Sequence, residues 1–304
     1  MKLHRQGVFA GVARGGATMK DALSGWKTIV VFLDNTPEGE IVGRQAAELA
    51  RRCGAHLIGI HALADYLEEH PAASFALGAE AVSGVIAEKA ADERNESRGV
   101  RHRLQAIVQK HGISGEIRII RGERGDDDLV AAARCCDLIV LGYPDPPGLP
   151  KTWPADRLLM ENGGPMLIVP TRAKAGTIGR NIVVAWNASR EARRAVREAM
   201  PLLSAADSVT VLVVDPESSG HKFHEGPGVD LARYLARHGV QARISRLETH
   251  GSSVAEAILS ATEAQAADLV VIGAYSHARL AEEIFGGVTR TLLARALVPL
   301  FLSA

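Results

Sequence analysis

The residues best placed to do chemistry are glycines and polar side chains near the C-terminus. Gly273 ends an apolar run, and the adjacent Gly286 and Gly287 stand at the entrance to a helical pattern over 288–295. A helix N-terminus offers unpaired N–H groups and a partial positive charge, and glycines let the backbone approach an oxyanion without an intervening Cβ. The segment therefore suits a phosphate group. The alternative is that these glycines only form tight turns.

A repeated pattern of strands and helices positions these glycines. The apolar runs 27–34 and 180–187 match nearly residue for residue, and so do 136–142 and 267–273. Their near-continuous apolar character predicts parallel strands covered on both faces. The other expected elements are strands at 55–61, 208–214, 165–169 and 298–302 and helices at 40–52, 79–109, 191–203 and 288–295.

The predicted fold class is α/β, with two tandem doubly wound domains. Each domain is expected to have a five-stranded, mainly parallel sheet flanked by helices. The domains span 26–171 and 180–304, and residues 1–25 are expected to be a leader without regular structure, with Met19 as a second candidate start. Ligands of open parallel sheets bind beyond the carboxyl ends of the strands. The residues that follow each strand are therefore the candidates for function.

Charge and cysteine content exclude several classes of partner. Lys plus Arg and Asp plus Glu both number 35, so the sequence predicts neither a nucleic-acid nor a membrane partner. No apolar run approaches the roughly 18 residues of a membrane span. Cys53, Cys135 and Cys136 have the spacing of neither a disulfide framework nor a zinc site, and a reducing, cytoplasmic location is expected.

The spacing of the C-terminal glycines resembles the ATP motif of the universal stress protein (UspA-like) family, Gly-x-x-Gly, nine residues, Gly-Ser/Thr. Here Gly273-x-x-Ser276 precedes nine residues and then Gly286-Gly287. Ser276 replaces a glycine of the motif, and Gly287 replaces a hydroxyl residue that contacts phosphate. The likeness covers about residues 27–303 and implies a tandem member with Rossmann-like, adenine nucleotide alpha hydrolase-like domains.

The resemblance implies a site for ATP or another adenine nucleotide in the second half. Thr289 would supply a hydroxyl at the helix start, and Arg279 would add charge near the phosphates. Asn187 stands where the family has an Asp that faces adenine and ribose, and its amide can still hydrogen-bond. The predicted nucleotide-binding residues are Asn187, Val213, Ile272, Gly273, Ser276, Arg279, Gly286, Gly287, Val288 and Thr289. No metal is expected beyond Mg²⁺ that accompanies the nucleotide.

The first half departs from this motif. It retains Asp34 and Gly142, but a proline-rich segment follows at 143–154, where prolines remove N–H donors, and Asp156 would repel phosphate. We therefore expect at most one nucleotide per chain, in the second half. Family members commonly dimerise through their last strands, so 165–169 and 298–302 are expected to pair as an internal pseudo-dimer, and a further homodimer stays open.

Three functions remain in view from the sequence. The first is a stress-response or regulatory module that senses adenine nucleotide, and the second is a nucleotide-free interaction or scaffold protein. The third, an ATP-cleaving or adenylating enzyme, lacks support because the sequence has no Gly-x-x-x-x-Gly-Lys-Ser/Thr loop, no Gly-x-Ser-x-Gly elbow and no acid/base cluster. His221, His224 and Glu225 are interpreted as a solvated loop rather than a metal site, and no catalytic residue is predicted.

Overall fold

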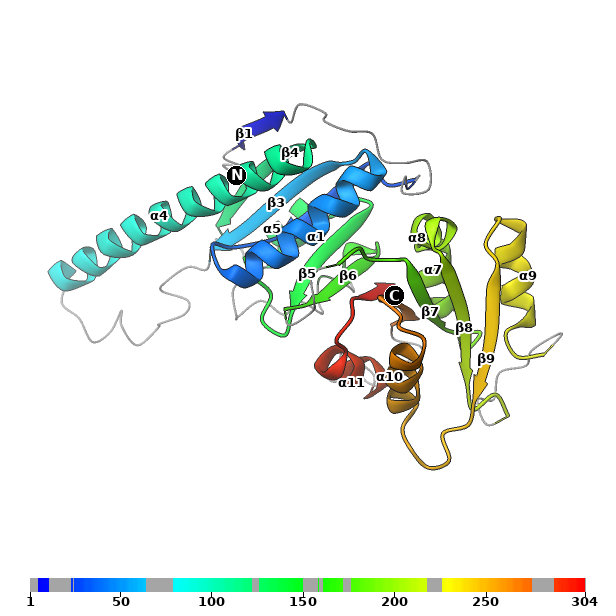
Figure 1. The fold of residues 1–304 in the computed structure, drawn as a ribbon. Coiled ribbons are helices and arrows are strands. Elements are labelled where there is room, and N and C mark those ends of the chain that lie inside the picture. Colours follow the sequence, from blue (N-terminus) through cyan, green and yellow to red (C-terminus); the bar gives the residue numbers. More distant parts are fainter. Residues whose placement is uncertain are drawn as a thin grey trace.

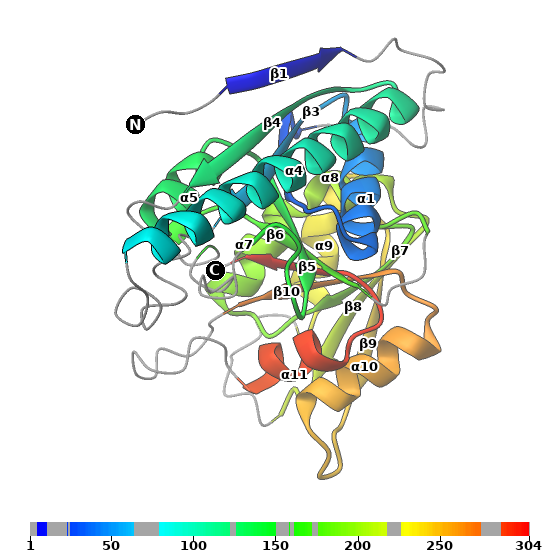
Figure 2. The same cartoon turned by 90° about the vertical axis from the view of Figure 1, so that its left-hand side faces the viewer.

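The computed structural model describes residues 5–10, 23, 25–63, 79–121, 126–149, 158, 161–171, 176–217, 226–274 and 287–303. Within these residues, eleven strands form one sheet that runs through both halves of the chain (Figure 1). Their order is β1-β4-β3-β2-β5-β6-β11-β10-β7-β8-β9. Separate apolar clusters lie on the two faces of the sheet, each covered by helices (Figure 2). The predicted α/β architecture is confirmed.

The first half winds outward from its first strand in both directions. Its strands are β2 (Thr28–Phe32), β3 (His56–Leu63), β4 (Ser114–Arg121), β5 (Leu138–Tyr143) and β6 (Met166–Pro170). Its helices are α1 (Pro37–Cys53), α4 (Ala79–His111) and α5 (Asp126–Ala133). All neighbouring strands in the order β4-β3-β2-β5-β6 are parallel, which places the switch point between β2 and β5.

The second half repeats this winding. Its strands are β7 (Asn181–Ala185), β8 (Ser208–Val214), β9 (Ala242–Leu247), β10 (Leu269–Gly273) and β11 (Leu300–Ser303). Its helices are α7 (Arg190–Glu198), α8 (Met200–Ala205), α9 (Val229–Arg237), α10 (Val254–Ala264) and α11 (Gly287–Arg295). The order β9-β8-β7-β10-β11 is again parallel throughout, with the switch point between β7 and β10.

The two halves join through their last strands. β6 and β11 pair antiparallel, with Leu167 opposite Phe301 and Ile168 opposite Leu300. Phe301 is completely buried and stacks on Trp26, with 6.1 Å between the ring centroids. The expected pairing of these two strands is confirmed, and it makes the sheet continuous.

The N-terminal segment differs from the prediction. Residues 1–25 were expected to lack regular structure, whereas β1 (Arg5–Ala10) pairs antiparallel with β4, and Leu23 is buried. Without β1, strand β4 would present a row of unpaired N–H and C=O groups at the edge of the sheet. The short, glycine-interrupted apolar run before residue 20 gave no periodic signal for this strand.

Helix ends follow local capping chemistry. α1 begins at Pro37, earlier than the expected residue 40, because the Thr36 side chain accepts a hydrogen bond from the Gly39 N–H. The single helix expected over 191–203 is divided into α7 and α8 at Ala199, with Pro201 in the first turn of α8. Proline lacks the N–H that would continue the first helix, so the chain starts a new one.

Helix α4 is 33 residues long and packs on the sheet through one stripe. Val100, Leu104 and Val108, spaced four residues apart, are fully buried against the strands. Figure 2 shows the helix lying across β3 and β4 and extending past them. Among the described residues, no helix combines the length and apolar character needed to cross a membrane.

Candidate functional site

The carboxyl ends of β7, β8 and β10 bring four predicted residues to one edge of the sheet. Ala185 of β7 is in register with Leu212 of β8 and with Ile272 of β10. Counted from these three residues toward the C-terminus of each strand, Val213 and Gly273 come one residue later and Asn187 comes two residues later. The structure places them at the switch point, where parallel sheets bind ligands.

Asn187 is held by a local turn that starts α7. Its Oδ1 accepts a hydrogen bond from the Ser189 N–H at 3.1 Å, and Ser189 Oγ accepts one from the Ala192 N–H at 3.1 Å. The amide oxygen is thus engaged in the turn. Within the described part of the chain, the NH₂ group of Asn187 makes no hydrogen bond, which leaves two donors for a ligand.

Close packing explains why residue 273 is a glycine. A Cβ at this position would lie 2.3 Å from the Ala192 nitrogen and 2.5 Å from the Glu191 carbonyl carbon. The glycine therefore lets β10 end against the first turn of α7, with or without a ligand. Val213 and Ile272 are 1% and 8% exposed and point to opposite faces of the sheet, Val213 into the cluster that α7 covers and Ile272 into the cluster that α10 and α11 cover.

Helix α11 contributes its first turn. Gly287 is its first residue and is exposed, Val288 is half-buried against the core, and Thr289 is buried. A Cβ at Gly287 would meet no atom of the described residues within 4 Å, so their packing does not require a glycine there. The predicted Ser276, Arg279 and Gly286 lie outside the described residues.

Two polar residues at this edge escaped the sequence analysis. Glu191 is 6% exposed in the first turn of α7 and ion-paired with Arg190. Burial opposes its ionisation, but hydrogen bonds and the charge of Arg190 hold the pKa of Glu191 below its ordinary value. Ser303, in register with Gly273, is fully buried, and its hydroxyl has no partner among the described residues. For Ser303, the sequence signal was the presence of a serine within the C-terminal apolar run.

The equivalent edge of the first half is occupied by its own loop. The Gly148 carbonyl accepts a hydrogen bond from the Ala62 N–H at 2.9 Å, and Leu149 is buried. Gly148 has a φ of +74°, and a Cβ there would lie 2.3 Å from the Leu33 carbonyl oxygen. A Cβ at Gly142 would meet Pro147 Cδ at 2.6 Å. Residues 147–149 therefore lie across the ends of β2 and β3.

A histidine stands in the first half where the second half has the buried Val213. Phe32 pairs with Ile60 as Ala185 pairs with Leu212, so His61 is the counterpart of Val213. His61 is 3% exposed, with Nδ1 3.3 Å from the Leu33 carbonyl oxygen. Burial lowers its pKa, and the nearby Glu96 acts in the opposite direction.

Asp34 keeps the same position as Asn187 but is used within the chain. Its Oδ1 accepts hydrogen bonds from both the backbone N–H, at 2.9 Å, and the hydroxyl of Thr36. Asp156 lies outside the described residues. In the first half, the retained carboxylate therefore holds Thr36, the N-cap residue of α1, beside the strand ends that residues 147–149 cover.

The remaining candidates bring no second centre. The structure describes no cluster of three or more His, Cys, Asp or Glu side chains that could hold a metal within its described ranges, and His221, His224 and Glu225 lie outside them. Burial raises the pKa of the Cys136 thiol to about 12, and its Sγ donates to the Ala133 carbonyl at 3.0 Å. That thiol is protonated and unreactive at neutral pH.

Comparison with known proteins assigns the family. The sequence profile described as the Universal stress protein family matches residues 25–159 and again residues 179–303. A search of curated proteins finds no match. A universal stress protein from Archaeoglobus fulgidus shares the fold with a TM-score of 0.63 and 14% identity, over 91% of this chain and 95% of that one.

A second solved structure supports the same fold. A protein of unknown function from Pseudomonas aeruginosa matches with a TM-score of 0.52 and 16% identity, over 93% of each chain. The two profile matches fall on the two halves that wind their strands identically. The chain belongs to the universal stress protein family and carries two of its domains in tandem.

Proposed function

We propose that this tandem universal stress protein binds ATP or another adenine nucleotide at the switch point of its second half only, and acts as a regulatory module. The observation that carries the proposal is the difference between the two switch points. Residues 147–149 lie across the first, whereas Asn187 and Gly273 border the second.

The chemistry of the second switch point suits a nucleotide. Val213 and Ile272 supply apolar side chains on opposite faces of the sheet at this edge. The NH₂ group of Asn187, which makes no hydrogen bond among the described residues, can donate to a ring nitrogen or a ribose hydroxyl. The first turn of α11 offers unpaired N–H groups for phosphate, with no Cβ at Gly287 to obstruct it. Mg²⁺ would accompany the phosphates.

The same geometry favours binding over turnover. Catalysis of phosphoryl transfer needs groups that position a nucleophile and neutralise developing charge. Glu191, the buried carboxylate nearest to Gly273, is already ion-paired with Arg190. We therefore propose a non-enzymatic role in which occupancy of the second half reports the adenine nucleotide level.

The test is to identify nucleotide released from the purified, denatured protein and to titrate the stripped protein with ATP, ADP and AMP by calorimetry in the presence of Mg²⁺. We expect saturable binding of at least one of the three. An absence of binding at roughly millimolar ATP, near the upper end of typical enzyme KM values, would refute nucleotide sensing. Release of phosphate from ATP at a rate of enzymatic turnover would contradict the non-catalytic role.

A further inference from the structure

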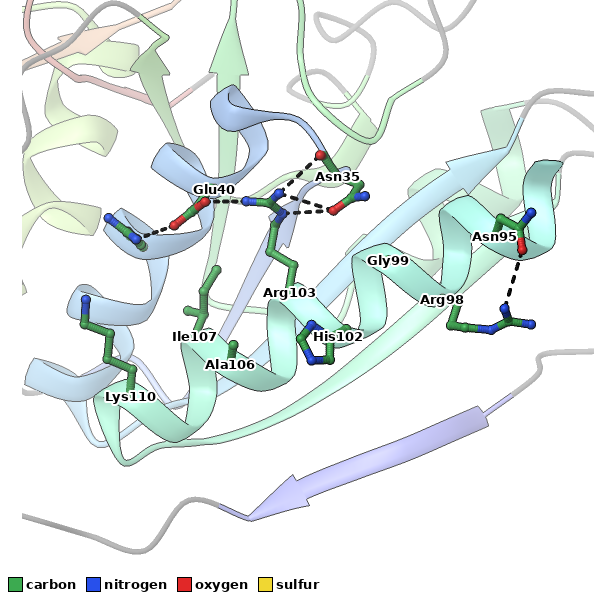
Figure 3. A pocket seen from close by; sticks show the side chains of 11 residues that line it. Asn35, Glu40, Asn95, Arg98, Gly99, His102, Arg103, Ala106, Ile107 and Lys110 are labelled. Atoms are coloured by element: carbon green, nitrogen blue, oxygen red, sulfur yellow. Dashed lines mark hydrogen bonds and ion pairs between the residues drawn. The ribbon is translucent and has the colours of Figure 1, made fainter.

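A groove of about 650 Å³ lies between α1 and α4 in the first half (Figure 3). Glu40 and Arg44 of α1 form one wall, and the 95–110 segment of α4 forms the other. Its size is in the range of ligand sites. Neither switch point uses these side chains apart from Asn35, which follows Asp34.

An ion pair and hydrogen bonds of Arg103 join the two walls of the groove. Arg103 donates from Nη1 to the Glu40 carboxylate and from Nε and Nη2 to Asn35 Oδ1, at 3.3 and 3.2 Å. Glu40 also pairs with Arg44 one turn along α1. Figure 3 shows Arg103 reaching from α4 toward both partners at the centre of the groove. These contacts hold α1 and α4 in place in the ligand-free protein.

The groove concentrates positive charge on a chain whose formal net charge is zero. Arg44, Arg98, Arg103 and Lys110 line it against the single carboxylate of Glu40, which leaves a net charge of +3 when His102 is neutral. Arg98 and Lys110 are exposed. Exposed cations around a groove raise the local concentration of anionic partners.

The cations are spread along the groove rather than gathered at one point. With a rise of about 1.5 Å per residue, Arg98, Arg103 and Lys110 are separated by about 8 and 10 Å along α4. A single phosphate needs donors that converge on it. By contrast, carboxylates on one side of an extended peptide recur about every 7 Å. Ala106 lines the groove between Arg103 and Lys110 with a short side chain that leaves room for a peptide backbone, whereas Gly99 makes room for the Asn35 side chain.

The groove depends on the length of α4. Equivalent turns follow the two helices, with Ile113 N–H bonded to the Val108 carbonyl and Val240 N–H bonded to the Leu235 carbonyl. By this correspondence α9, which begins at Val229, starts at the position of His102. The part of the wall before His102 has no counterpart in the described residues of the second half.

We propose that the groove between α1 and α4 binds an acidic peptide segment of a partner protein in extended conformation. The charge of the groove, the spacing of its cations and the short side chain of Ala106 fit this ligand. The site is separate from the proposed nucleotide site, so either proposal can fail without the other.

The test uses the full chain and a fluorescein-labelled ten-residue peptide of alternating Glu and Ser, with a Lys-Ser peptide as the charge control. Fluorescence anisotropy is measured for the wild type, for Arg98→Ala/Lys110→Ala, and for Arg94→Ala/Arg237→Ala. The last variant removes the same charge from exposed helix positions outside the groove. Circular dichroism checks that each variant is folded.

We expect the wild type to bind the Glu-Ser peptide and not the Lys-Ser peptide. The groove variant should bind the Glu-Ser peptide about tenfold more weakly and the control variant less than about twofold more weakly, since each exposed ion pair contributes modestly. Binding should also weaken as salt rises. No binding by the wild type at low salt, or equal losses in the two variants, would overturn the proposal. So would tripolyphosphate binding through Arg98 and Lys110 more tightly than the peptide, because the ligand would then be a small phosphate compound.

Discussion

At the carboxyl ends of their central strands, the two halves of this chain use the same geometry in opposite ways. In the first half, Gly148 hydrogen-bonds to Ala62 and rests on the Leu33 backbone, so the chain itself occupies the switch point. In the second half, Asn187 and Gly273 follow the ends of the neighbouring strands β7 and β10. Duplication of the fold therefore preserved the winding, while the residues at the carboxyl ends of the central strands diverged between the two halves.

The largest expected effect concerns the loop that fills the first crevice. Gly148→Ala should destabilise the protein by on the order of 3 kcal/mol, because the new Cβ meets rigid backbone in a left-handed conformation. Urea unfolding measures the change. Gly163→Ala is the matched control: its φ is +73° and a Cβ there meets nothing within 4 Å, so it should cost only about 1 kcal/mol. Equal costs would show that residue 148 does not pack on Leu33.

The second prediction restores a hydroxyl at the start of α11. Because a Cβ at Gly287 meets no neighbour, Gly287→Ser should leave stability nearly unchanged. If phosphate lies there, the added donor should tighten ATP binding by about tenfold, the value of one good hydrogen bond to a charged group. Calorimetry with ATP measures the gain. Unchanged affinity would place the phosphates elsewhere.

The third prediction uses the buried histidine of the first half. Burial lowers the pKa of His61 in the folded protein, so the unfolded chain binds the proton more readily. Stability is therefore fully present above the unfolded pKa of about 6.5 and is lost as the pH falls, by at most about 1.4 kcal/mol per pH unit. Glu96 reduces this slope.

Replacing the histidine with the residue of the other half isolates this contribution. His61→Val copies Val213 and should flatten the loss of stability between about pH 6.5 and pH 5, a window set by the unfolded histidine pKa. Urea unfolding of both proteins across this range provides the comparison. An identical pH dependence in the two proteins would show that His61 does not carry the effect.

The smallest expected effect exchanges the residues that follow the first strands. Asn187→Asp should strengthen nucleotide binding about threefold, since a charged acceptor forms stronger hydrogen bonds with ribose hydroxyls. Asp34→Asn, the reverse change in the first half, should leave binding unaltered because Asp34 bonds to Thr36, the N-cap residue of α1, within the chain. A loss of nucleotide binding in Asp34→Asn would mean that the first half takes part in the site.

Long-period sequence repetition was enough to predict the fold. The matched runs 27–34 and 180–187 became β2 and β7, and the terminal runs became the paired β6 and β11. The β1 strand could not be predicted, because its pairing depends on the free edge of β4, about 100 residues away, rather than on its own pattern. Edge strands of this kind carry little local signal.

Residues of the candidate site could be predicted only where they directly follow a strand. Gly273 was identified because ligands of parallel sheets bind beyond the strand ends, and Asn187 was identified through the family resemblance, as the residue in the place of the family's Asp. Glu191 and Ser303 were missed because their burial arises from the packing of α7 and the pairing of β11 with β10, which local sequence does not encode. The sequence predicted that the loop over the first crevice lacks a phosphate site. The hydrogen bond between Gly148 and Ala62 could be recognised only in the three-dimensional structure.

The number of nucleotides bound per chain tests the central claim most directly. Calorimetric titration with ATP should give one site in the wild type, no binding in Gly286→Val, and unchanged binding in Ala155→Val, the equivalent change in the first half. Two sites per chain, or a loss of binding in Ala155→Val equal to that in Gly286→Val, would contradict a single site in the second half.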